Sequence, residues 1–384
     1  MNDNRVQLGR RLMAEVLSPI KRAFVGKDEI VDLMGVCLVG GENLYILGPP
    51  GTAKSALVQE LARRIDGRVF DYLLTRFTEP NELFGPFDIR RLREGDLVTN
   101  TEGMLPEASI VFLDELLNAN SAILNSLLMV LNERVFRRGR ETRQLPTLMV
   151  VGASNRLPED DTLGALFDRF LMRVRCDNVD TQLLPDVLVA GWQLDVLGRQ
   201  RQATLSVDDI RQLNQMLPQM DLERVRPDYV RLVGRLRQAG IALSDRRAVK
   251  LQRLVAASAL VCGRLQADVT DLWVLRYIWD TEEQQEILAS LVDHAIAEAD
   301  ESQQATSHPR SRAGRGPDPE ALARDLEAIL QRLGRDGVPD AERATLADRL
   351  GLLSGRIQWL TDDQQRTFLE GQVTGLWQRL RVTP

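Results

Sequence analysis

The stretch that decides the fold is Gly48-Pro49-Pro50-Gly51-Thr52-Ala53-Lys54-Ser55. The apolar run 44–47 precedes it, and a helical pattern of apolar residues over 56–65 follows it. Strand, glycine-rich turn and helix in this order are the context of a phosphate-binding loop. Such a turn exposes successive backbone N–H groups, and the following helix adds the positive end of its dipole. A polyphosphate is the ligand that this arrangement fits.

Two side chains at the end of this stretch extend the prediction. Lys54 would reach the outer phosphates, and the Ser55 hydroxyl would ligate Mg²⁺. Lysine otherwise occurs only at positions 21, 27 and 250, and a compact ammonium serves a phosphate loop in a way that a planar guanidinium does not. Ala53 replaces the second glycine of the motif, which costs backbone freedom but adds only a methyl group. The alternative is a structural turn before a helix, which leaves the placement of Lys-Ser unexplained.

Composition and charge limit the class of protein. The 384 residues are 44% hydrophobic, which is ample for a packed core. A formal charge of −6 gives no global attraction to nucleic acid, and with two histidines, His294 and His308, histidine-based catalysis is disfavoured. No apolar run reaches roughly 18 residues, so we expect no transmembrane helix.

The N-terminus and the cysteines indicate the compartment. Met1-Asn2-Asp3-Asn4 lacks the charged and apolar regions of a secretory signal. Cys37, Cys176 and Cys262 are far apart, in apolar or mixed surroundings. They suit a reduced cytoplasm and favour neither a disulfide framework nor a metal site. We therefore expect a cytoplasmic protein.

A second chemical landmark follows about 60 residues later, where Ile110-Val111-Phe112-Leu113 leads into Asp114-Glu115. Four apolar residues predict a strand that is buried on both faces. Two carboxylates at its end need partners, and the alternative is a solvated turn. With a phosphate loop, Asp114 would hold Mg²⁺ through water and Glu115 would polarise the attacking water.

Asn155 ends another apolar strand, over 148–154. If the two strands are neighbours, its amide would lie beside Asp114 and Glu115 and orient the water near the outer phosphate. A plain strand-to-loop asparagine is the alternative. Earlier in the chain, Val25 and Gly26 either pack locally or flank an adenine, and the residues alone leave both open.

Three arginines have no role in their own phosphate site that the residues define. Arg169 ends a helix, and an exposed arginine at a subunit edge would reach a neighbour's nucleotide as an arginine finger. Arg246 and Arg247 lie in the first turn of a helix capped by Ser244, where they oppose the helix dipole. That cost favours an anionic partner such as phosphate, and a solvated basic turn is the alternative.

The pattern changes along the chain and divides it into four parts. Residues 1–180 alternate strands and helices, which predicts an α/β core with a parallel sheet. Residues 181–300 carry helical patterns alone, and the polar, proline- and glycine-rich segment 301–319 predicts a linker. Residues 320–384 predict three amphipathic helices, which either pack together or dock on a partner.

Together these motifs resemble the AAA+ ATPases, and among them the helix-2-insert clade, the MoxR family and its RavA-like branch. The resemblance spans about residues 20–265 and is carried by these segments in the family's order: 48–55, Thr75-Arg76-Phe77 to Phe84-Gly85-Pro86, Leu105-Pro106-Glu107-Ala108, Val111 to Glu115, Leu131-Asn132-Glu133-Arg134, Ala153-Ser154-Asn155, Asp168-Arg169 and Ser244-Asp245-Arg246-Arg247. The segment after residue 300 matches no motif of the family.

The resemblance implies an αβα core with an all-helical lid, with ATP and Mg²⁺ bound between them and between subunits. Lys54 and Ser55 resemble Walker A, Asp114 and Glu115 resemble Walker B, and Asn155 resembles sensor 1. Arg169 resembles the arginine finger, and Arg247 resembles sensor 2, with Arg246 as the alternative. Residues 88–103 and 133–143 match two hairpins that face the pore or one rim of such rings.

The sequence therefore predicts an ATPase ring, expected to be a hexamer, that remodels protein clients, and the resemblance implies a task in protein maturation or metal-cofactor insertion. The resemblance alone adds a partner with a von Willebrand factor A domain. One rival is a nucleic-acid motor, favoured by the basic patch Arg134, Arg137, Arg138, Arg140 and Arg143 but opposed by the acidic total and the few aromatic residues. A second rival is a regulatory switch that binds ATP and recruits a partner.

Overall fold

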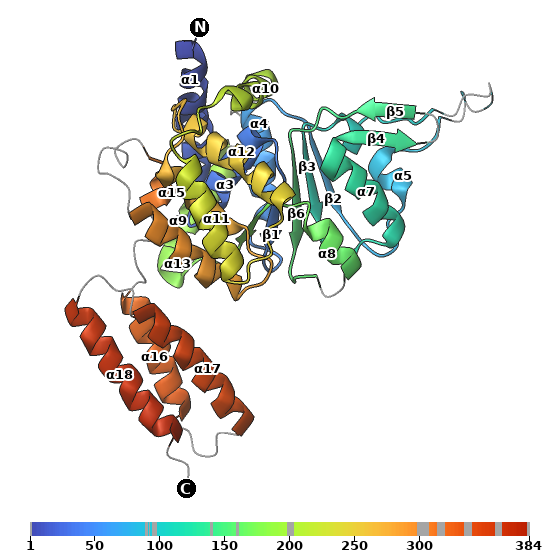
Figure 1. The fold of residues 1–384 in the computed structure, drawn as a ribbon. Coiled ribbons are helices and arrows are strands. Elements are labelled where there is room, and N and C mark those ends of the chain that lie inside the picture. Colours follow the sequence, from blue (N-terminus) through green and yellow to red (C-terminus); the bar gives the residue numbers. More distant parts are fainter. Residues whose placement is uncertain are drawn as a thin grey trace. The chain divides into compact units, whose positions relative to one another are not determined.

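The computed structural model describes residues 2–88, 91, 93, 98–138, 141–158, 161–197, 203–297, 307–312, 319–333, 340–357 and 363–381. The chain forms two compact units, residues 1–311 and 312–384, shown in Figure 1. Residues 89, 90, 92 and 94–97 of the predicted hairpin over 88–103 lie outside the described residues, as does most of the predicted linker over 301–319. At the base of this hairpin, Phe87 and Thr99 form an antiparallel bridge.

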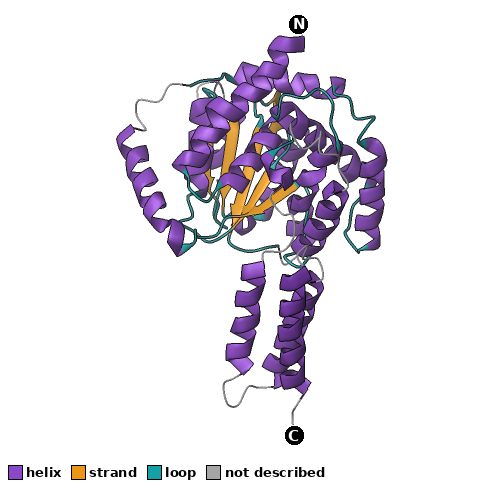
Figure 2. Cartoon of the chain, turned by 90° about the vertical axis from the view of Figure 1, so that its left-hand side faces the viewer, coloured by secondary structure: helices purple, strands orange, loops and turns teal. Residues whose placement is uncertain are grey.

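A five-stranded parallel sheet organises the first unit. Its order is β2-β3-β6-β1-β7, with β1 at Leu44–Leu47, β2 at Val69–Leu73, β3 at Ile110–Asp114, β6 at Met149–Ser154 and β7 at Met172–Arg175. Figure 2 shows helices on both sides of the strands. Covered faces explain why β1 and β6 are apolar throughout, because alternation is lost when both faces are buried. This is the predicted α/β core.

Helices supply the two layers around the sheet. In the α/β part they are α1 Asn2–Arg11, the π-helical turn η1 Leu12–Leu17, α2 Ser18–Ala23, α3 Asp28–Gly40, α4 Lys54–Arg64, α5 Pro80–Phe84, η2 Leu105–Glu107, η3 Leu116–Asn118, α7 Ser121–Glu133 and α8 Asp161–Phe167. A small antiparallel hairpin, β4 Val135–Arg138 with β5 Glu141–Gln144, follows α7.

The chain after residue 180 has helices as the only regular elements among its described residues, as the pattern predicts, with one isolated bridge between Asp221 and Gln266. Its elements are η4 Thr181–Leu183, α9 Leu184–Leu197, α10 Val207–Met216, η5 Leu217–Gln219, α11 Arg226–Gln238, α12 Asp245–Val261, η6 Val269–Tyr277, α13 Gln284–Ala297 and α15 Pro309–Arg312. Trp273, Tyr277 and Trp279 are buried, as predicted, although η6 is a 3₁₀ helix.

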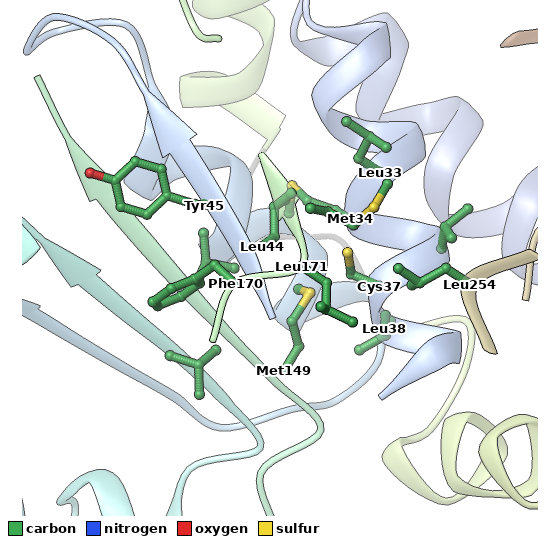
Figure 3. Close-up of a cluster of buried hydrophobic side chains, with 14 of the residues drawn as sticks. Leu33, Met34, Cys37, Leu38, Leu44, Tyr45, Met149, Phe170, Leu171 and Leu254 are labelled. Atoms are coloured by element: carbon green, nitrogen blue, oxygen red, sulfur yellow. The ribbon is translucent and has the colours of Figure 1, made fainter. Parts of the chain in front are cut away.

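One hydrophobic core joins the sheet to the later helices. Figure 3 shows Leu33, Met34, Cys37 and Leu38 of α3 between β1 and Leu254 of α12. At Gly40, an added Cβ would lie 2.9 Å from a methyl carbon of Leu254, so α12 packs closely against the end of α3. All the residues shown are buried. The helix α12 is thus packed against the α/β core.

Part of the predicted linker is packed. His308 is fully buried, stacks on Trp273 at 4.6 Å between ring centroids, and accepts a hydrogen bond from the Arg310 backbone N–H at its Nδ1 (3.1 Å). The Arg310 guanidinium pairs with buried Asp32 of α3 at 3.0 Å. Residues 308–311 therefore anchor the end of the first unit to its core.

The second unit is a bundle of three helices, α16 Pro319–Leu333, α17 Asp340–Ile357 and α18 Asp363–Arg381. They pack against one another around their own core of buried residues: Leu322, Leu326, Ile329, Leu346, Leu350, Leu353, Ile357, Leu369, Val373 and Leu376. Of the two arrangements left open by the sequence, mutual packing is the one found. The aliphatic residues recur at helical spacing, which gives each helix an inward face.

Candidate functional site

The phosphate-loop candidate joins β1 to α4 as the sequence predicts. Gly51 has φ 81° and Ala53 has φ 67° and ψ 24°, so both lie in the left-handed region. The Lys54 ammonium donates to the carbonyl oxygens of Gly48 at 2.9 Å and Pro49 at 2.8 Å. These bonds hold the ammonium inside the curve of the loop, with 6% of the residue exposed.

Gly48 is required by a close approach of two backbones. An added Cβ would lie 2.2 Å from the carbonyl oxygen of Cys176, just after β7. The Gly48 N–H donates to the Ser154 carbonyl at 2.9 Å, and the Cys176 N–H donates to the Leu47 carbonyl at 2.7 Å. The loop is therefore fixed between the ends of β6 and β7.

The two carboxylates lie at the carboxyl end of β3, two strands from the loop. Glu115 has φ 50° and ψ 43°, a conformation that costs an L-residue roughly 1–2 kcal/mol. Its N–H donates to Asp114 Oδ1 at 3.0 Å, and Asn118 Nδ2 donates to its carboxylate at 3.3 Å. Strain at a residue with reactive chemistry is a feature of functional sites.

Asn155 directly follows β6, the strand between β3 and β1. The register pairs Leu113 with Gly152 and Leu47 with Ser154. The two strands are thus neighbours, and Asn155 lies at the same edge as the loop and the carboxylates. Tyr45 of β1 is held near this edge, because its hydroxyl donates a hydrogen bond to the Arg156 carbonyl at 3.2 Å. Burial raises the pKa of the Tyr45 phenol.

Val25 and Gly26 lie beside the segment that follows β7. A Cβ on Gly26 would approach a methyl of Val179 to 2.8 Å, and Gly26 has φ 74°. Lys27 is 7% exposed and donates from Nζ to the Asp177 carbonyl. Since Cys176 of the same segment touches the loop at Gly48, the turn 24–27 borders the phosphate-loop candidate.

Arg169 lies at the opposite edge of the sheet. It precedes β7, and its carbonyl accepts a hydrogen bond at 3.0 Å from Asn43, which precedes β1. Because β1 and β7 are parallel, Arg169 is at their amino ends while Lys54 follows the carboxyl end of β1. Four residues of strand separate these edges by about 13 Å or more. Arg169 is therefore far from the loop of its own chain.

A pocket of about 470 Å³ brings Arg169 together with the arginines of α12. Arg246, Arg247 and Lys250 line it with Arg169, alongside Asp168, Asp280 and neighbouring residues. The buried Nε atoms of Arg169 and Arg247 have no hydrogen-bond acceptor among the described residues. The pocket thus combines four cationic side chains with unused donors.

Asp280 holds Arg247 and the strand residue Arg173. Arg247 Nη1 donates to both carboxylate oxygens at 3.1 Å, and Arg173 Nη1 lies 2.9 Å from Oδ1. Arg173 is fully buried and also donates to the Ile278 and Trp279 carbonyls at 3.1 and 2.9 Å. Burial, followed by the charge of Arg247, lowers the pKa of Arg173 to about 9.

The sequence reasoning missed Arg173, Asp280 and Lys250 as parts of this cluster. Arg173 carried a signal, since a charged residue between the apolar Met172 and Val174 of a strand needs a partner. Asp280 and Lys250 carried none, because only the tertiary fold brings them to β7. The predicted residue Arg247 is found beside Arg169 and apart from the Lys54 edge.

The predicted basic patch is largely engaged within the molecule. Arg134 donates to Asn43 Oδ1 at 2.6 Å, and Arg138 donates to the Gly85 carbonyl at 2.6 Å. Arg143 donates to Thr101 at 3.1 Å, and Arg137 pairs with Glu133 at 3.5 Å. Arg140 lies outside the described residues. These contacts fasten the hairpin to its surroundings and weaken the nucleic-acid alternative.

The residues at the loop edge suit a nucleotide with Mg²⁺. The loop offers an ammonium and a helix N-terminus, and Ser55 and Asp114 supply the oxygen donors that Mg²⁺ prefers. Gly51 has no atom within 4 Å of an added Cβ, so the space over the loop is open. In the described part of the chain, His, Cys, Asp and Glu form no cluster of three or more suited to a metal.

No helix in the described ranges is long and apolar enough to cross a membrane. Within the same ranges, Cys37, Cys176 and Cys262 are unpaired.

Comparison with known proteins matches the chain to two family models. One, described as the MoxR domain in the MoxR-vWA-beta-propeller ternary systems, matches residues 10–215. The other, an AAA lid domain, matches residues 220–292. The first match covers more than half of the chain, and the second falls on the helices after residue 180.

Individual relatives agree with these matches. An uncharacterised protein of Methanocaldococcus jannaschii is 36% identical over 276 residues, 70% of each chain. The chaperone MoxR1 of Mycobacterium tuberculosis is 26% identical over 215 residues, 55% of each chain. The crystal structure of a putative ATPase from Cytophaga hutchinsonii covers 77% of this chain and 97% of its own, with TM-score 0.61 at 18% identity, a likeness of fold.

Proposed function

Because the chain belongs to the MoxR family of AAA+ ATPases, we propose that it hydrolyses ATP as a hexameric ring and uses this cycle to remodel client proteins. The observation that carries the proposal is the separation of two half-sites. Lys54, Glu115 and Asn155 lie at the carboxyl edge of the sheet, whereas Arg169 lies at its amino edge. Each copy would complete the site of the next.

At the carboxyl edge, the roles follow from the chemistry of each group. Lys54 and the loop N–H groups would bind the phosphates, and Ser55 with Asp114 would hold Mg²⁺. Mg²⁺ would neutralise charge that develops on the phosphate oxygens. Glu115 would accept the proton of the attacking water, and Asn155 would orient that water.

At the amino edge, Arg169 would enter the neighbour's site as the finger. Its unused Nε and the neighbouring Arg246, Arg247 and Lys250 would meet phosphate oxygens there. A finger supplied in trans contributes roughly 10³–10⁵ to the rate. We propose that Arg247 acts in the same direction, because it shares the pocket of Arg169. Asp280 would position it.

At the turn 24–27, Val25 and Gly26 would flank the adenine. Their contacts with the segment after β7 support this role, since that segment also touches the phosphate loop.

The proposed partner is a protein with a von Willebrand factor A domain, and the description of the matching family adds a β-propeller protein. A RavA-like relationship, with a task in protein maturation or metal-cofactor insertion, belongs to the same proposal. The unpaired cysteines suit action in the cytoplasm.

Glu115→Gln tests the proposed hydrolysis. The amide keeps the shape of the side chain but accepts no proton, so ATP turnover should fall at least about 100-fold while ATP binding is retained. Steady-state phosphate release and binding of a fluorescent ATP analogue measure the two. Glu223→Gln, at an exposed lid position, is the matched control and should leave both unchanged. Full turnover by Glu115→Gln would refute the assignment.

The same assay separates the motor from the regulatory switch. A motor turns over ATP steadily and accelerates with its client, whereas a switch hydrolyses one nucleotide slowly and then stops. Brisk steady turnover without a partner would exclude the switch. Stimulation by DNA that disappears at high salt would instead favour the nucleic-acid motor.

A further inference from the structure

The helix α9 is rich in apolar residues yet largely exposed. Leu184, Leu188, Trp192 and Val196 recur at i, i+4, i+8 and i+12, which forms one outward stripe. Their exposed fractions are 44, 65, 74 and 64%. By side-chain size they expose roughly 500 Å², near the upper end of the largest apolar patches on monomeric proteins. An exposed apolar patch of this size marks an interaction surface.

Among the described residues of the first unit, the inward side of α9 is the side that packs against the rest of the chain. Val187, Ala190 and Leu194 are half-buried, and Leu194 packs against the main core. The stripe defined by Leu184, Leu188, Trp192 and Val196 points away from that side, because it is offset by about half a turn. Among the described residues of the first unit, nothing covers the outward stripe.

The stripe lies close to the phosphate loop along the chain. Residues 176–183 connect β7 to α9, and within them Cys176 approaches Gly48 while Val179 and Leu183 approach Gly26. Under the proposed function, a neighbouring copy must approach this loop to insert Arg169. A surface beginning a few residues away is then covered by the same neighbour.

Charge identifies the face of the neighbour that fits. Residues 176–197 contain four aspartates and no lysine or arginine. The lid helices α11 and α12 contain eight lysines and arginines and two aspartates, and their Val230 and Val249 are 63 and 64% exposed. Val249 is one residue from Lys250, which lines the pocket of Arg169. That face is apolar and cationic, so it complements the apolar and acidic α9.

We propose that the outward stripe of α9 docks on the α11–α12 face of the next copy of this chain, around Val249. The two surfaces differ, so the contact is heterologous and its repetition closes a ring or extends a filament. The acidic flanks disfavour the alternative that α9 lies on an anionic membrane, which cationic residues would be needed to attract. This inference rests on the proposed function, because it places the two half-sites in one interface.

Two single substitutions test each side of the contact in the full-length chain. Trp192→Asp blocks the α9 side and Val249→Asp blocks the lid side. Both are made in a Glu115→Gln background with ATP and Mg²⁺, and assembly is measured by sedimentation velocity. Each should reduce the assembled fraction at least about tenfold, as expected for a central interface residue. Gln193→Asp adds the same charge at an exposed position beside the stripe and should assemble normally.

Mixing the two variants shows whether the sides meet each other. A Trp192→Asp copy keeps its lid face, and a Val249→Asp copy keeps its α9 stripe. Together they have one intact contact per pair, so the mixture should form dimers and no ring, while each alone stays monomeric. Dimers in the mixture also show that both variants are folded.

Other outcomes overturn the inference. If both variants assemble like the Glu115→Gln parent, the stripe is not a subunit contact. If, in addition, the parent binds anionic lipid vesicles and Trp192→Asp does not, the stripe is assigned to a membrane instead. If the parent itself stays monomeric with ATP, the proposed ring fails, and the α9 contact fails with it. If the parent and both variants all assemble, the α9 contact is refuted and the proposed ring is not.

Discussion

Ala53 and Glu115 show that this site stores strain at single residues. Both are L-residues in the left-handed region, with φ 67° and 50°. A glycine relieves that strain and costs some unfolded-state entropy. We expect Ala53→Gly to raise the free energy of unfolding by roughly 0.5–1 kcal/mol, since relief of about 1–2 kcal/mol exceeds the entropy cost.

Ala56→Gly is the matched control for this prediction. It lies in the first turns of the same helix α4, with ordinary helical geometry, and should lower the free energy of unfolding by up to about 1 kcal/mol. Chemical denaturation of both variants measures the difference. Equal losses in the two variants would show that Ala53 is unstrained.

Loss of the Asp280 carboxylate should destabilise the lid. Asp280→Asn leaves Arg173, which is fully buried, and Arg247 without their shared carboxylate. Removing one partner of a buried pair costs about 3–5 kcal/mol. Thermal unfolding should show a drop of many degrees, whereas Asp177→Asn, at the exposed pair with Arg175, should change little. An unchanged midpoint for Asp280→Asn would mean that the cluster is not needed.

At the scale of single residues, the sequence predicts the site residues that lie within short motifs and misses those that tertiary packing brings together. Lys54, Ser55 and the two carboxylates stand in motifs whose chemistry can be read from their neighbours in the chain. The structure then brings Arg169 and Arg247 into one pocket. That pairing depends on how α12 packs, which no motif encodes, and so Asp280 could not be foreseen.

Among the elements, the anchor at 308–311 gives a pH-dependent stability. Burial lowers the pKa of His308 to about 4, against a small opposite effect of Asp32. At pH 5 the His308 side chain is protonated in the unfolded chain but mostly neutral in the folded chain. The contribution of His308 to stability is therefore complete above about pH 6.5 and falls as the pH falls towards 4. Between pH 7 and 5 we expect this group to remove about 2 kcal/mol.

His308→Asn tests that contribution. Asparagine does not titrate, and its carbonyl can still accept the Arg310 N–H as a helix cap. Thermal midpoints at pH 7 and 5 should differ less in the variant than in the parent. The same decline in both proteins would assign the acid sensitivity to other groups.

The elements themselves were foreseen to different degrees. Apolar runs followed by polar residues predicted the strands, because parallel strands are buried on both faces. The packing of residues 308–311 was not predicted, because the prolines and glycines around them indicated a linker.

For the whole molecule, the central feature is that the two halves of the proposed site lie at opposite edges of one sheet. A single copy cannot bring Arg169 to its own Lys54, since at least the length of β1 separates them. Sequence motifs predict the residues of both halves but not the edge of the sheet at which each half lies. The edge at which each half lies follows from the parallel pairing of β1 and β7, which is known only from the fold.

The most direct test mixes Lys54→Ala with Arg169→Ala chains and measures steady-state ATP turnover. Each variant alone should be inactive, one without a bound nucleotide and the other without a finger. In a 1:1 mixture, about a quarter of the interfaces pair an intact loop with an intact finger, so turnover should recover to about a quarter of the parent value. Coassembly without recovery at any ratio would contradict the shared site.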